Sequence, residues 1–186
     1  MLVKDKIRIL FCSMAAVIVV ALAGSASADT AMQRNSEVTR ELSDFKRVAF
    51  EMRREADTLS SFTPQRQLSW QSHASRLNTL KDRVNELGQS LAQLEALRPM
   101  ANETQTLAIE HARPHLVSVA KNLTEAIELV NEDRRSVYWG DYGEAVSDVY
   151  SQANALHGKI DAILDYEKAK TRLQSLELQL DSMGRS

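Results

Sequence analysis

Between residues 70 and 94, apolar side chains recur at alternating steps of three and four residues. This spacing is the heptad pattern of a long helix that packs along one face against other helices. A strand cannot follow this period, because its side chains alternate at every second residue. The pattern therefore restricts the chain to a fold in which long helices bury such stripes against one another. Its positions are Trp70, His73, Leu77, Leu80, Val84, Leu87, Leu91 and Leu94.

Three further stretches carry stripes of the same kind, and the connections between them are short, so consecutive helices are expected to lie antiparallel. The sequence predicts an all-α fold, a single antiparallel up-down-up-down four-helix bundle with long helices, over residues 29–186. Two separate coiled-coil hairpins in an oligomer would use the same stripes. The predicted helices span residues 30–62, 64–97, 102–139 and 142–182. In the last one, a single side is predicted to carry Val149, Ala153, Leu156, Ile160, Ile163, Leu173, Leu176 and Leu180.

Local signals suggest where two of these helices begin. Thr63 is predicted to cap the second helix, with Pro64 in the first helical position, where its missing amide costs nothing. Asn102 and Gln105 have the three-residue spacing of a capping box, which predicts the start of the third helix. Pro114 lies inside that third helix and is expected to kink it, because proline removes a backbone hydrogen bond.

The first 28 residues have the pattern of a signal peptide. Three basic residues precede an apolar run over residues 9–23, and small residues follow up to Ala28, after which cleavage is expected. The run is shorter than the roughly 20 residues of a membrane-spanning helix. The mature chain is therefore predicted to be periplasmic or secreted, with no membrane insertion after signal cleavage. Cys12 leaves with the signal, so the mature chain can form no disulfide.

The charge pattern bears on the kind of partner. The whole chain has a formal net charge of −2. Three basic residues and one acidic residue lie in the predicted signal, so the mature chain is near −4. Basic residues alternate with acidic ones, as in the run Lys81-Asp82-Arg83, and form no basic face of the kind that phosphate backbones require. No nucleic acid is expected as a partner.

An aromatic cluster is the most site-like feature of the sequence. In the predicted topology the first and third connections meet at one end of the bundle, and they bring together five of the ten aromatic residues, Phe62 among them. Aromatic rings beside arginines are typical of protein-binding hot spots. Packing of the bundle end by large rings is the alternative interpretation. The predicted partner-binding residues are Trp139, Tyr138, Tyr142, Trp70, Arg134 and Arg135.

A second candidate site is a metal or small-ligand site on the helix faces. His111 and His115 lie one helical turn apart, a spacing at which two imidazoles can bind one metal ion. Glu167 on the last helix, and Glu37 or Glu41 on the first, are predicted to lie at about the same height, so that a carboxylate can complete the set. No haem, di-iron or copper pattern accompanies these residues, so no cofactor is expected.

The sequence contains no recognisable catalytic motif. Its serines lie in no Gly-x-Ser-x-Gly turn, and no cysteine remains after processing, so the chain is not expected to be an enzyme. We expect an exported, non-catalytic protein-interaction, adaptor or chaperone-like module of the cell envelope, which contacts another envelope protein or associates with itself. The alternative is a metal- or small-ligand-binding bundle that uses His111 and His115.

Overall fold

The computed structural model describes residues 28–184, with side chains from residue 36 onward, and every regular element in this range is a helix. The predicted signal peptide lies outside the described residues, except for Ala28, which begins the first helix. None of the described helices combines the length and apolar character that crossing a membrane requires. The long helices are α1 (Ala28–Phe62), α2 (Trp70–Leu97), α3 (Glu103–Glu132) and α4 (Gly140–Gly184), and two short 3-10 helices are η1 (Arg98–Met100) and η2 (Arg134–Tyr138).

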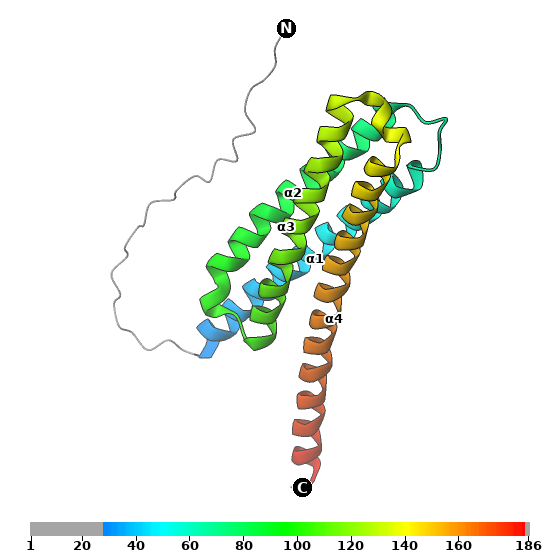
Figure 1. The fold of residues 1–186 in the computed structure, drawn as a ribbon. Helices are drawn as coiled ribbons and strands as arrows, with labels where there is room; N and C mark the ends of the chain where they lie inside the picture. Colours follow the sequence, from blue (N-terminus) through cyan, green and yellow to red (C-terminus); the bar gives the residue numbers. More distant parts are fainter. Residues whose placement is uncertain (1–27, 185–186) are drawn as a thin grey trace, which may run out of the picture.

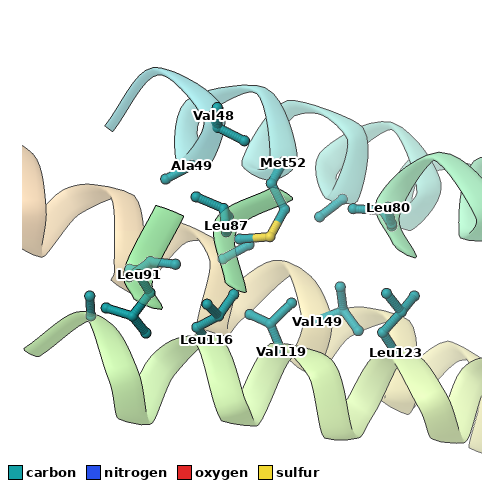
Figure 2. Close-up of a cluster of buried hydrophobic side chains, with 14 of the residues drawn as sticks. Val48, Ala49, Met52, Leu80, Leu87, Leu91, Leu116, Val119, Leu123 and Val149 are labelled. Atoms are coloured by element: carbon teal, nitrogen blue, oxygen red, sulfur yellow. The ribbon is translucent and has the colours of Figure 1, made fainter. Parts of the chain in front are cut away.

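The four long helices pack around one common core, which confirms the prediction of an all-helical fold with four packed helices. Helix α1 packs beside α2 and α4, and α3 also packs beside α2 and α4 (Figure 1). Each helix contributes apolar side chains to the core: Figure 2 shows Met52 of α1, Leu87 of α2, Val119 of α3 and Val149 of α4 within one cluster. Burial of this continuous apolar surface is the main source of the bundle's stability.

The predicted stripes match the buried faces of the first three helices. In α2, six of the eight heptad residues are buried, and Trp70 and Val84 are partly buried. In α3 the stripe is buried from Ile109 to Val130, except that Ile127 is partly buried. In α1 the apolar residues at steps of three and four are all fully buried: Val38, Leu42, Phe45, Ala49, Met52, Ala56 and Leu59.

The predicted start of α2 is wrong by six residues. The Thr63 hydroxyl donates to the Ser60 carbonyl at 2.9 Å, so it closes the end of α1 instead of capping a new helix. Pro64 lies in the turn that follows. Helix α2 begins at Trp70, and the side chain of Ser69 caps it by accepting a first-turn amide.

The predicted start of α3 is confirmed by a complete capping box. The Gln105 amide donates to the Asn102 side chain at 2.9 Å, and the Asn102 amide donates to the Gln105 side chain at 2.9 Å. Helix α3 continues through Pro114. Pro114 has no amide to donate to the Glu110 carbonyl, and both residues are exposed. The helix ends at Glu132 rather than at residue 139, because η2 intervenes.

At the end of the bundle where α3 begins, polar contacts join three helices. The Gln105 side-chain amide donates to Thr39 of α1 at 2.9 Å, and the Asn102 side-chain amide donates to Glu167 of α4 at 2.5 Å. Nearby, Lys46 of α1 forms an ion pair with Asp161 of α4. Among the side chains that the structure describes, these contacts tie α4 to the other helices at this end of the bundle.

Helix α4 continues beyond this level, past the ends of its neighbours (Figure 1). From Lys168 to Gly184 every side chain is exposed. The prediction that Leu173, Leu176 and Leu180 share a buried side with Val149 is therefore wrong: these three leucines are exposed, and Val149 is fully buried.

Candidate functional site

Two connections meet at the end of the bundle where α2 and α4 begin, as the sequence predicts for the aromatic cluster. The loop of residues 63–69 joins α1 to α2, and η2 joins α3 to α4. The Tyr138 hydroxyl donates to the Leu68 carbonyl at 3.0 Å and ties the two connections together. The Arg134 guanidinium lies 4.4 Å from the centre of the Trp70 ring, which is a cation–π contact between them.

The inner layer of this end is a buried group of three rings. The His73 and Tyr142 rings lie 5.4 Å apart in an edge-on arrangement, and the Phe62 and His73 rings lie 5.7 Å apart in the same way. The Nδ1 of His73 lies 3.0 Å from the Tyr142 hydroxyl, within hydrogen-bond distance. Tyr142 is fully buried, so this predicted partner-binding residue belongs to the core of the bundle end and not to its surface.

Burial also sets the charge state of this inner layer. It lowers the pKa of His73, because an imidazolium loses its hydration in the core. It raises the pKa of the Tyr142 hydroxyl for the same reason, since the phenolate is the form that needs water. Both side chains are therefore neutral at pH 7, and the inner layer is a neutral plug.

The outer layer consists of the remaining predicted residues, and it differs in exposure from one to the next. Trp70 is partly buried under Arg134, Tyr138 is at the margin of exposure, and Arg135 is exposed. Trp139 is 65 % exposed, an unusual state for the largest apolar side chain. We call Trp139, Tyr138, Trp70, Arg134 and Arg135 the aromatic tip.

The backbone on both sides of Trp139 is fixed. The Trp139 amide donates to the Ser136 carbonyl at 2.8 Å, and its carbonyl accepts from the Gly143 amide at 3.3 Å. The indole therefore stands on a rigid junction between η2 and α4, not on a long flexible loop. An exposed ring on a fixed backbone loses little conformational entropy when a partner covers it.

The predicted metal set is not assembled. The Nδ1 of His115 lies 3.0 Å from the side-chain oxygen of Gln152 on α4. Glu167 lies fifteen residues further along the same helix, which is about 22 Å of helix axis, and it accepts from Asn102 at the start of α3. The prediction that Glu167 shares a height with His111 and His115 is therefore wrong. Among the described side chains, no group of three or more His, Cys, Asp or Glu residues could hold a metal ion.

One surface that the sequence analysis did not recognise lies on the exposed end of α4. Its leucines have the same steps of three and four as the core stripes, so spacing alone assigned them to the core. The signal that separates them is a change of helix face after Leu164, the last buried residue of α4. The molecule thus has two exposed apolar features, the aromatic tip at one end and the α4 leucines at the other. Comparisons of the chain with known protein families, with curated proteins and with solved structures find no match.

Proposed function

We propose that this protein is an exported, non-catalytic interaction module of the cell envelope, built as an up-down-up-down bundle, and that its aromatic tip binds a partner protein. The exposure of Trp139 on a fixed backbone carries the proposal. Solvent-exposed tryptophan beside tyrosine and arginine is the composition that dominates binding energy at protein interfaces. The inner ring layer already closes the bundle end, so Trp139 is not needed for that purpose.

The chemistry of the aromatic tip indicates what its partner offers. Trp139 and Tyr138 supply apolar ring surface, and Arg135 adds an exposed positive charge next to them. Arg134 is held over Trp70, which stiffens the edge of this surface. A partner that fits presents an apolar side chain with a carboxylate beside it, so that the ring area is buried and the guanidinium is paired.

Site-specific crosslinking in the native host tests this function. A photo-reactive amino acid replaces Trp139, and a matched variant carries it at Val117, which is 62 % exposed on α3 and lies away from the aromatic tip. We expect one envelope protein to be captured from position 139 and not from position 117. Arg135→Glu in the first variant should reduce the capture, because it places a like charge against the partner's carboxylate. Equal capture at both positions would contradict the proposal.

Export is a separate part of the proposal and rests on the basic residues and apolar run of the first 28 residues. Fractionation of the host followed by intact-mass measurement tests it. The expected product lies outside the cytoplasm and begins at Asp29. A full-length chain in the cytoplasm would contradict export and leave the aromatic tip to be judged by crosslinking alone.

A further inference from the structure

The last part of α4 carries an apolar stripe with no partner in the described chain. We call residues 165–184 the α4 extension. Within it, apolar residues again follow steps of three and four, and none of them is buried. Monomeric proteins rarely leave a continuous apolar stripe in water, so such a surface marks an interaction site. The stripe consists of Tyr166, Ala169, Leu173, Leu176, Leu180 and Met183.

This stripe faces away from the bundle's own core. An α-helix turns by about 100° per residue, so Leu173 lies about 180° around the helix from Leu164, the last buried residue. On the side that continues the core face, the extension instead presents Thr171 and Ser175, which line a hollow opposite Ser43 of α1. Apart from Leu178, the apolar residues of the extension therefore lie on the opposite face where the bundle ends.

An uncovered helix of this length is only marginally stable in water, because most helical stability in proteins comes from packing of an apolar face. We propose that the stripe packs against the same stripe of a second copy of this chain, in an antiparallel two-helix coiled coil. Such a contact is isologous, since the same surface serves both copies. The following observations support this occupant, and the placement of the two bundles supports this direction.

The spacing of the stripe suits antiparallel self-pairing from end to end. Tyr166 faces Met183 of the second copy, Ala169 faces its Leu180, and Leu173 faces its Leu176. Two-fold symmetry repeats each of these pairs, so every residue of the stripe meets another residue of the stripe. The small Ala169 leaves room for the larger leucine opposite, as interdigitated packing requires.

The charges beside the stripe are complementary in the same arrangement. Lys170 and Glu177 occupy equivalent flanking positions seven residues apart. Antiparallel pairing places Lys170 opposite Glu177 of the second copy, and symmetry forms this ion pair twice. On the other edge, Arg172 lies opposite Gln179, which can accept a hydrogen bond from its guanidinium. No like charges meet along either edge.

The apolar surface also continues from the extension onto the bundle. Leu107 of α3, which is 45 % exposed, lines a hollow of about 450 Å³ together with Ile163 and Tyr166 of α4. In the proposed pairing, Met183 of the second copy lies beside Tyr166, at the edge of this hollow. The far end of one extension thus meets an apolar site where the other copy's bundle ends.

A parallel pair would not bring Met183 of the second copy to this apolar hollow. It would bring the two bundles side by side along the outward face of α4, which carries the exposed Asp148 and Lys159. Each of these charges would then approach its own copy, and like charges at an interface disfavour association. The antiparallel pair instead places the two bundles at opposite ends. If the proposed function of the aromatic tip also holds, one dimer presents two aromatic tips that point away from each other.

Sedimentation analysis of the chain from residue 29 onward, which keeps all four helices, tests the dimer. We expect a monomer–dimer equilibrium, and we expect Leu176→Glu to weaken it by at least about tenfold, the effect of losing a single well-packed contact. Leu178→Glu is the matched control, because Leu178 is 71 % exposed on the same helix but lies off the stripe. Circular dichroism checks that both variants stay folded. A chain that is monomeric at about 100 μM, or equal effects of the two substitutions, would overturn the proposal.

A charge exchange tests the direction of pairing. Lys170→Glu and Glu177→Lys should each weaken the homodimer, whereas an equimolar mixture of the two variants should form a heterodimer, because each chain then supplies the charges that the other lacks. The double variant should dimerise like the original chain. In a parallel pair Lys170 would meet Asp165 and Glu177 would meet Arg172, so neither mixing nor combination would restore association. Failure of both restorations would overturn the antiparallel arrangement. Trp139→Ala should leave the dimer unchanged, which separates this test from that of the aromatic tip.

Discussion

The Nδ1 of His73 and the hydroxyl of Tyr142 lie 3.0 Å apart in the core, where they join the first turn of α2 to the first turn of α4. Both side chains are almost completely buried. Each satisfies a polar atom of the other, and the Phe62 ring packs edge-on against the imidazole. A buried polar pair of this kind is favourable only while both partners are present.

Removal of one partner should therefore cost more than removal of both. Tyr142→Phe keeps the ring and leaves the His73 nitrogen without its partner, so we expect the free energy of unfolding to fall by about 1 to 3 kcal/mol. Urea denaturation measures this loss. In the double variant that adds His73→Leu, the loss should be smaller than the sum of the two single losses. Additive losses would show that the two side chains do not stabilise each other.

The same burial predicts how stability depends on pH. Because the pKa of His73 is lowered in the folded chain, the unfolded chain binds a proton first as the pH falls below about 6.5. The free energy of unfolding should therefore decrease between pH 7 and pH 5. Burial also lowers the pKa of His157, so this residue acts in the same direction. Thermal unfolding at the two pH values checks the trend.

Substitution separates the two histidines in that measurement. His73→Leu should reduce the loss of stability between pH 7 and pH 5 but not abolish it, because His157 remains. Asp161 does not interfere in this window: Lys46 lowers its pKa below the ordinary value near 3.8, so its effect appears only in more acidic solution. An unchanged pH dependence in His73→Leu would mean that this imidazole is not the group that titrates.

Much of the fold was predictable from the sequence because core positions at steps of three and four stay on one helix face. This rule identified the buried residues of α1, α2 and α3. It failed in α4, where Leu173 lies ten positions after Ile163, a distance that the same steps cover without an interruption. Only the structure shows that burial of α4 ends at Leu164, after which its apolar residues lie on another face of the helix.

The sequence predicts the end of the bundle at which the aromatic residues gather, but it does not predict how deeply each of them is buried. Aromatic residues do gather around the two connections, yet Tyr142 lies in the core and Trp139, three residues earlier, is exposed. This difference in burial depends on His73, which belongs to another helix and gives the Tyr142 hydroxyl a buried hydrogen-bond partner. The predicted start of α2 was wrong for a similar reason. A threonine before a proline is compatible both with a helix start and with a turn. Here the Thr63 hydroxyl donates to the Ser60 carbonyl, which stabilises the turn.

The same leucine-to-alanine substitution should lower the free energy of unfolding by different amounts, depending on where the leucine lies in the fold. Leu87 is fully buried among side chains of all four helices (Figure 2), and Leu178 is 71 % exposed on α4. We expect Leu87→Ala to lower the free energy of unfolding by about 2 to 5 kcal/mol, since it opens a cavity in the core. Leu178→Ala should change it by less than about 0.5 kcal/mol. Urea denaturation of both variants at one protein concentration makes the comparison, and similar losses would contradict the core assignment.

Substitution of the two tryptophans of the aromatic tip should separate an effect on stability from an effect on partner binding. Trp70 packs against the core and carries Arg134 on its face, so Trp70→Ala should lower the free energy of unfolding by about 1.5 to 3 kcal/mol. Trp139 packs little of its surface, so Trp139→Ala should cost less than about 0.5 kcal/mol, although it removes the larger part of the proposed binding surface. Thermal unfolding gives both values, and pull-down of the partner captured at position 139 gives the second readout. A large loss of stability in Trp139→Ala would assign this ring to bundle packing and remove the main observation behind the proposed binding surface.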